Sequence, residues 1–153
     1  MKRIISIASM LLASCGTTQP DIEYKLDFSP ELQDQVFEYL ADCQRFLYTH
    51  RCNQRIELKV KVQKLPDPQQ LGVCYTYHPP HEHKRHIYIS PKVMGTDLQK
   101  LVVYHELTHC LFEEDHYDTK VDIMNTYTFS NKATHIYNNW DGYLEKMFGR
   151  ISL

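Results

Sequence analysis

Apolar and polar residues alternate along two short segments of the chain. Apolar side chains fill every second position of residues 22–28 and, more regularly, of residues 55–64. Alternation of this kind is typical of strands with one buried face. Two further segments, residues 73–77 and 86–90, fit a β-hairpin whose long loop is stiffened by a pair of prolines. These patterns predict four strands.

Three other segments carry apolar residues at the three- and four-residue spacing of a helix face. The first covers residues 29–50 and starts with a cap residue, a first-turn proline and an acidic residue. The second begins after a cap at Thr96-Asp97 and continues to about Phe112, and the third begins at about Asn131. Strands and helices followed by a loop-rich C-terminal part predict an α+β domain.

The N-terminus resembles the signal peptide of a bacterial lipoprotein. Lys2 and Arg3 precede an apolar run over residues 4–12, which is too short to span a bilayer. The run leads into Leu-Ala-Ser-Cys, which is similar to a lipobox, the motif whose Cys is lipidated after cleavage. We therefore expect residues 1–14 to be removed and Cys15 to carry the lipid. A chance Cys in an ordinary signal peptide is the alternative.

The predicted mature chain begins with a short tether. Residues 15–20 are small and polar, and residues 21–153 form the domain. The lipid on Cys15 is expected to hold the protein at a membrane of the cell envelope. Gly16 follows it, where an inner-membrane retention signal would resemble Asp, and this favours the outer membrane if the host is Gram-negative.

Composition limits the class of protein. The length of 153 residues fits one domain, and a net charge of −2 with acids and bases interspersed provides no basic surface for a polyanion. We therefore expect no nucleic-acid partner. Four cysteines besides Cys15 permit two disulfides in three possible pairings, or buried thiols, in an exported chain. They are Cys43, Cys52, Cys74 and Cys110.

The second predicted helix carries the sequence His-Glu-Leu-Thr-His from His105 to His109. Two residues four apart lie about 40° from one another around a helix, so both imidazoles point the same way. This arrangement suits two nitrogen atoms that bind one zinc ion. Glu106 lies beside them, where it can take a proton from a zinc-bound water. The alternative is an accidental motif on a solvated helix face.

The residues that follow resemble the metzincin clan of zinc endopeptidases. Its pattern, HExxHxxGxxH or HExxHxxGxxD, precedes a tight turn with a Met beneath the metal. His105 and His109 match the first two ligands, Glu106 matches the general base, and Met124 matches the Met of the turn. The similarity is specific only over residues 105–125 and loose over the rest.

This resemblance implies a metzincin-like zincin fold. A small mixed twisted sheet would have a backing helix and an active-site helix. A C-terminal subdomain would carry the Met-turn and a final helix. One catalytic zinc ion is the implied cofactor.

The chain departs from the family pattern at two places. Phe112 occupies the position of the family's Gly, which lets the chain leave the helix in a left-handed conformation. The third ligand is Asp115 at the family's spacing, or His116 one residue later. We favour His116 because neutral imidazole is the commonest zinc ligand. A helix-borne Glu145, as in the gluzincins, is a further alternative, but it would leave the Met without a role.

Tyr127 follows Met124 by three residues, whereas some metzincins have a Tyr two residues after the Met that supports the transition state. The offset favours a packing role for Tyr127, with transition-state support as the alternative.

Four more histidines crowd the predicted hairpin, with irregular spacing and basic neighbours that argue against a second metal site. They are His78, His81, His83 and His86. If the hairpin borders the cleft, its loop contacts the substrate, which would add to the sheet as a strand.

These features predict a lipid-anchored zinc endopeptidase that hydrolyses a peptide or protein substrate. Zinc would be bound by His105, His109 and His116, and Glu106 would act as general base. The alternatives are a zinc-binding lipoprotein without catalysis and a structural envelope lipoprotein in which the motif is accidental.

Overall fold

A computed structural model describes most of the predicted domain. It covers residues 25–46, 56–117, 121–125 and 133–151. The predicted signal peptide, the tether with Cys15, and Tyr127 lie outside the described residues. Within these ranges, none of the helices has both the length and the apolar character needed to cross a membrane.

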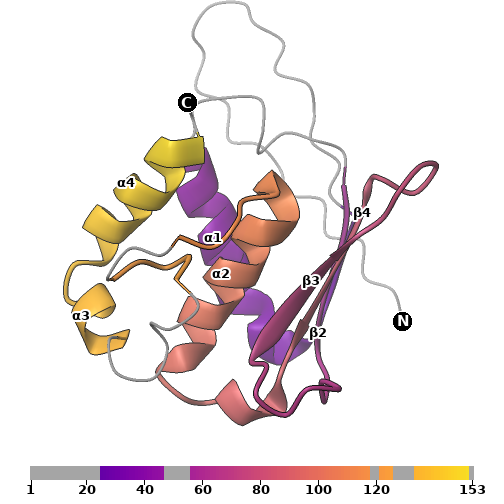
Figure 1. Cartoon of the computed structure of the whole chain (residues 1–153), viewed down its shortest axis with the longest axis horizontal. Helices are drawn as coiled ribbons and strands as arrows, with labels where there is room; N and C mark the ends of the chain where they lie inside the picture. Colours follow the sequence, from indigo (N-terminus) through magenta and orange to yellow (C-terminus); the bar gives the residue numbers. More distant parts are fainter. Residues whose placement is uncertain (1–24, 47–55, 118–120, 126–132, 152–153) are drawn as a thin grey trace, which may run out of the picture.

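The fold is mixed α+β, as predicted, and is built on one four-stranded sheet (Figure 1). The strand order is β1-β2-β4-β3, in which β1, β2 and β4 are parallel and β3 is antiparallel at the edge. The predicted hairpin is confirmed as the β3–β4 pair. The strands are β1 (Lys25–Phe28), β2 (Glu57–Val62), β3 (Gly72–Thr76) and β4 (Lys84–Ile89).

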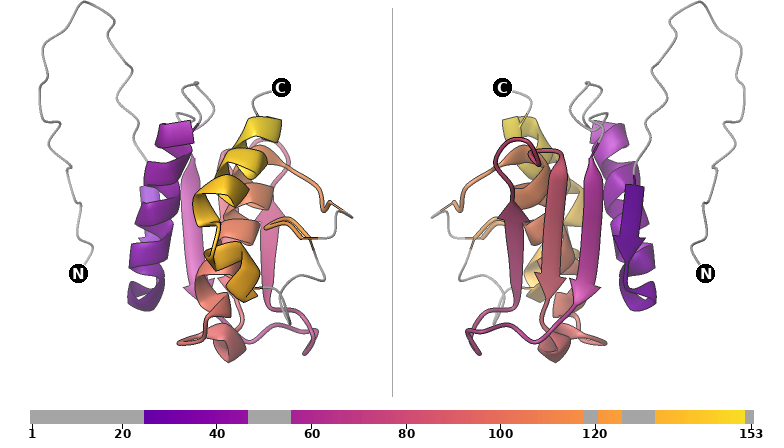
Figure 2. Two further views of the ribbon diagram at one scale, coloured as in Figure 1. Left: turned by 90° about the vertical axis from the view of Figure 1, so that its left-hand side faces the viewer. Right: turned by 90° about the vertical axis from the view of Figure 1, so that its right-hand side faces the viewer.

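The four helices found in the described residues pack on one side of this sheet. Short 3-10 turns, Pro30–Leu32 and Pro91–Val93, precede the first two of them. The two long helices α1 and α2 lie next to the sheet, and α4 lies on their outer side (Figure 2). The other sheet face has no helix over it within the described part of the chain. The helices are α1 (Gln33–Phe46), α2 (Leu98–Phe112), α3 (Ala133–Tyr137) and α4 (Trp140–Ile151).

Helix α2 is the central element of the domain. It contacts β3 and β4 on one side and α1 on another, so nine of its residues are buried. Thr96 supplies the N-terminal cap, because its hydroxyl accepts a hydrogen bond from the Leu98 N–H at 3.2 Å. The predicted second cap residue, Asp97, makes no side-chain cap bond.

The prediction of one continuous final helix from Asn131 is wrong within the described residues. The segment forms two helices, α3 and α4, separated by a turn at Asn138 and Asn139. Apolar residues keep the helical spacing across this turn, so periodicity alone does not reveal it. Asn favours turns and caps because its side chain competes for backbone hydrogen bonds.

The C-terminus of α2 has an unusual backbone conformation. The helix ends at Phe112, and Glu113 follows with φ 56° and ψ 28°, in the left-handed region. Its N–H donates to the carbonyl of His109 at 2.9 Å. The left-handed residue thus falls one position after the place where the metzincin pattern has Gly.

We expect Glu113→Gly to be more stable than Glu113→Gln by about 0.5–1 kcal/mol, because only Gly adopts this conformation without steric cost. Both substitutions remove the negative charge that pairs with Arg85, whose Nη2 lies 3.2 Å from Oε1 of Glu113. Gln can still accept a hydrogen bond from Arg85 and Gly cannot, so a higher stability of the Gly variant has to come from the backbone. Chemical denaturation of the two variants measures it. Equal free energies of unfolding would contradict the prediction.

Candidate metal centre

Three histidine side chains converge beside the C-terminal half of α2. His105 and His109 lie on the helix, and His116 lies on the segment that follows it. Their Nε2 atoms are 3.0 Å (His105–His109), 3.1 Å (His105–His116) and 3.1 Å (His109–His116) apart. Nitrogen atoms bound to one tetrahedral zinc ion are roughly 3.3 Å apart, given Zn–N distances of about 2.0–2.1 Å.

Backbone carbonyls fix the orientation of two of these rings. His105 Nδ1 bonds to the carbonyl of Ile123 at 2.8 Å, and His109 Nδ1 bonds to the carbonyl of Glu114. A carbonyl only accepts, so each Nδ1 carries the proton and each Nε2 presents a lone pair. Burial lowers the pKa of His105 to about 3, and the ring is therefore neutral at neutral pH.

The donor set fits a metal ion. Lone pairs that converge at about 3 Å repel one another unless a cation binds them. The three Nε2 atoms form the group of possible metal ligands in the described part of the chain. Two alternative third ligands, Asp115 and Glu145, do not belong to this group.

Glu106 is buried beside the three histidines. It is 7% exposed, and burial raises its pKa to about 8. A cation bound nearby would counteract that shift. The ionised form that such a cation favours is the form in which a carboxylate can accept a proton.

Gly72 on the edge strand β3 makes room for Glu106. A Cβ atom at position 72 would lie 2.6 Å from both Cγ and Oε1 of Glu106, a separation that real Cβ atoms do not tolerate. The strand can approach the helix this closely only because residue 72 is Gly. Gly72 was not among the predicted site residues, because the strand predicted from the sequence began at Val73 and the structure extends β3 by one residue to include Gly72. A Gly in a strand is a known signal of close backbone approach.

A cleft of about 760 Å³ lies between β3 and α2 and contains the three histidines and Glu106. One wall is formed by residues 71–74 and Thr76 of the edge strand region, and the opposite wall by α2 and residues 113–116. Within the described residues, β3 pairs only with β4. Its other edge therefore has backbone groups available for an extended ligand.

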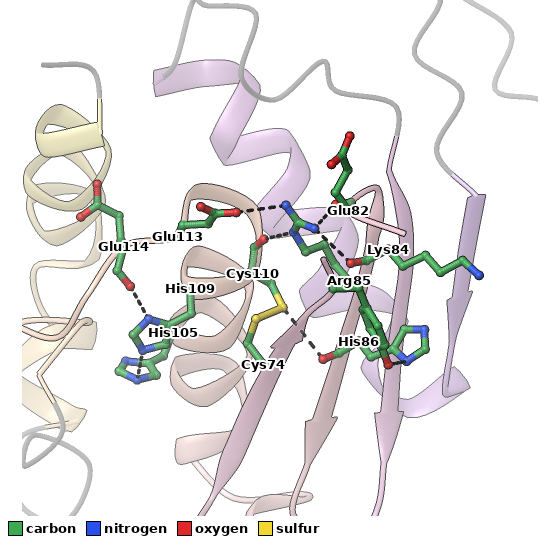
Figure 3. The surroundings of a disulfide bond; sticks show 11 residues. Cys74, Glu82, Lys84, Arg85, His86, His105, His109, Cys110, Glu113 and Glu114 are labelled. Carbon is green, nitrogen blue, oxygen red and sulfur yellow. Dashed lines mark hydrogen bonds and ion pairs between the residues drawn. A yellow bond between two sulfur atoms is a disulfide. The ribbon is translucent and has the colours of Figure 1, made fainter. Parts of the chain in front are cut away.

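A disulfide between Cys74 and Cys110 links the two walls of the cleft (Figure 3). Cys110 directly follows the second histidine, and the two Cα atoms are 5.5 Å apart. The structure thus selects one of the pairings that the sequence left open. Cys43 is also disulfide-bonded, and the fourth cysteine, Cys52, lies outside the described residues.

Arg85 of β4 binds the C-terminal end of α2 (Figure 3). Its Nε donates to the carbonyl of Cys110 at 2.7 Å, and its Nη2 donates to Oε1 of Glu113 at 3.2 Å. Cations at this end of a helix satisfy free carbonyls and favour the helix dipole. The helix end from which the chain turns back towards His116 is therefore bound to the sheet.

Met124 is fully buried in a turn. The Asn125 N–H donates to the carbonyl of Asp122 at 3.3 Å, and the Met124 N–H donates to Oδ1 of Asp122 at 2.9 Å. The same turn supplies the Ile123 carbonyl that orients His105. Met124 was predicted from the sequence, whereas Asp122 and Ile123 were not.

The hairpin histidines do not join the three-histidine group. His86 lies on β4, where its Nδ1 is 2.6 Å from the Tyr77 hydroxyl. The other three histidines lie in the turn between β3 and β4.

Comparison with known proteins gives no assignment. No family model matches the chain, and neither a curated protein nor a solved structure matches it. The geometry of the site is therefore the basis for assigning a function.

Proposed function

We propose that the protein is a zinc-dependent endopeptidase of metzincin type. The observation that carries this proposal is the convergence of three Nε2 atoms, each about 3 Å from the others, in a cleft that also holds the buried carboxyl of Glu106. A site for a purely structural zinc ion has no need of such a carboxyl and is more often closed by a fourth protein ligand.

His105, His109 and His116 would hold the metal ion. A bound zinc ion supplies an activated water and polarises the scissile carbonyl. Glu106 removes a proton from the attacking water and later delivers it to the leaving amine. Its position against Gly72 and its burial keep the carboxyl in place for both transfers.

The substrate is proposed to be an extended peptide segment. A peptide that pairs with the open edge of β3 would lie along the cleft, with its backbone held by main-chain hydrogen bonds. We further propose that Cys15 carries a lipid that keeps the enzyme at a membrane of the cell envelope. Substrates would then be peptides or proteins in the same compartment.

Metal analysis combined with a cleavage assay tests the proposal. The full chain is expected to contain one zinc ion and to cleave members of a peptide library. Chelation should abolish cleavage, and added zinc should restore it. Bound zinc without cleavage would favour a binding lipoprotein, and the absence of bound zinc would favour a structural one. Either result would overturn the proposal.

Gly72→Ala is expected to lower kcat for peptide hydrolysis by about 10- to 100-fold, because a displacement of about 1 Å at a reacting group costs this much. Zinc content should not change, since no ligand is altered. Gly149→Ala is the matched control, because a Cβ atom at this position of α4 meets open space. Steady-state kinetics of both variants measures the effect. If Gly72→Ala retained the wild-type kcat, Gly72 would not position Glu106.

A further inference from the structure

Arg150 near the end of α4 forms a bidentate ion pair with Asp122. Its Nη1 lies 2.7 Å from Oδ2 and its Nη2 lies 2.9 Å from Oδ1 of the carboxylate, whose side chain is 2% exposed. Burial raises the pKa of Asp122, but hydrogen bonds from Arg150, the Met124 N–H and Lys146 together lower it below its ordinary value. The pair is therefore ionised and holds a buried charge in a fixed orientation.

Asp122 shapes the turn that orients the first metal ligand. Its Oδ1 accepts the Met124 N–H, and its carbonyl accepts the Asn125 N–H. Ile123 lies between these bonds, and its carbonyl binds Nδ1 of His105 at 2.8 Å. Any movement of the Asp122 carboxylate is thus transmitted to the ring of His105 through one residue of backbone.

Arg150 is also connected to the second ligand, His109, through a series of contacts. The guanidinium carbon lies 4.0 Å from the centre of the Tyr117 ring, which is a cation–π contact. The Tyr117 hydroxyl donates to Oε2 of Glu114 at 2.6 Å, and the Glu114 carbonyl binds Nδ1 of His109. Tyr117 is also joined to the turn, because its N–H donates to the Met124 carbonyl at 3.1 Å.

We infer that Arg150 is a positioning residue for the metal centre, because its guanidinium connects the two backbone carbonyls that orient His105 and His109. This inference rests on the proposed metal site. Groups that orient histidine ligands typically change metal affinity by about 10- to 100-fold when they are removed. Arg150 acts on the histidines through its contacts with Asp122 and Tyr117.

Lys146 provides a matched control, since it also lies on α4 and also contacts Asp122. Its Nζ is 3.0 Å from Oδ2, but its side chain is 43% exposed. It has a single charged group without the planar fork that binds both carboxylate oxygens and stacks on a ring. Its loss leaves both oxygens of the Asp122 carboxylate paired with Arg150, so metal affinity should change by less than about 5-fold.

The experiment measures zinc affinity of the full chain by competition with a chelating dye, and the visible spectrum of the cobalt(II) form. We expect Arg150→Met to raise the Kd by about 10- to 100-fold and to shift the cobalt bands. Arg150→Lys should give an intermediate Kd, and Lys146→Met should bind zinc almost as the wild type does. Asp122→Asn should reproduce most of the effect of Arg150→Met.

A melting curve without metal separates positioning from stability. If Arg150 only stabilised the fold, Arg150→Lys would lower the melting temperature but leave the Kd and the cobalt spectrum unchanged, and the inference would be overturned. If Arg150→Met does not fold, the zinc Kd and the cobalt spectrum of Arg150→Lys and Asp122→Asn test the inference. Wild-type protein that binds no metal would overturn the proposed function as well, so the two failures are distinguishable.

Discussion

Glu106→Gln is expected to lower kcat for peptide hydrolysis by about 10²- to 10⁴-fold, the usual contribution of a general base. Gln has nearly the shape of Glu, so it keeps the packing against Gly72, but its amide cannot accept the proton of the attacking water. The zinc content should stay at one ion per chain, because the three histidines are unchanged. Cleavage kinetics and metal analysis on the same preparations measure both quantities.

The same substitution should not destabilise the metal-free protein. The pKa of Glu106 is raised to about 8 by burial, above its value in the unfolded chain. The folded state therefore binds more protons between the two pKa values, and its stability falls as the pH rises through this range. Gln removes this dependence. Above pH 8 the metal-free variant should melt at a higher temperature than the wild type.

Glu113→Gln is the matched control for Glu106→Gln. It is also an acid-to-amide change near the cleft, but Glu113 has a side chain that is 70% exposed and paired with Arg85. It should retain most of the wild-type kcat. Peptide cleavage that persisted at the wild-type rate in Glu106→Gln would contradict the assigned role of Glu106.

Much of the fold was predictable because its strands and long helices have one buried and one exposed face. The alternation over residues 55–64 predicted β2, and the spacing of apolar residues predicted α2 with its end at Phe112. The final helix was predicted less well. Its apolar residues keep the helical spacing through Asn138 and Asn139, but the backbone forms a turn there and interrupts the helix.

The candidate site was predictable only where the sequence pattern is local. His105, Glu106 and His109 follow from their spacing on one helix. Gly72 and Arg150 do not, because their roles depend on contacts with residues 34 or 28 positions away, Glu106 and Asp122 respectively. Such contacts are set by the packing of β3 and α4 against the rest of the domain, and no single segment of the sequence encodes them.

The third ligand, His116, was only partly predictable from the sequence. An uninterrupted helix would carry His116 roughly 10 Å along the axis from His109, so its position depends on how α2 ends. Phe112 remains helical and Glu113 takes the left-handed conformation. The chain therefore leaves the helix one residue later than in the metzincin pattern. For the same reason, the side chain that reaches the other two histidines is His116 and not Asp115.

His116→Ala is therefore expected to raise the Kd for zinc by more than about 100-fold, beyond the effect of losing an orienting group. Its Nε2 lies 3.1 Å from the Nε2 atoms of both His105 and His109, and Ala leaves the ion with two protein ligands. Competition with a chelating dye measures the affinity, and the cobalt(II) spectrum reports the lost ligand.

Asp115→Ala is the control for this prediction, because Asp115 stands at the spacing that the metzincin pattern assigns to the third ligand. Asp115 is exposed and outside the group of converging histidines. Its negative charge acts on His109 only through space, so its removal should change the Kd by less than about 5-fold. A larger loss of affinity in Asp115→Ala than in His116→Ala would place the third ligand one residue earlier. In that case we would expect the left-handed residue to be Phe112 and not Glu113, as in the metzincin pattern.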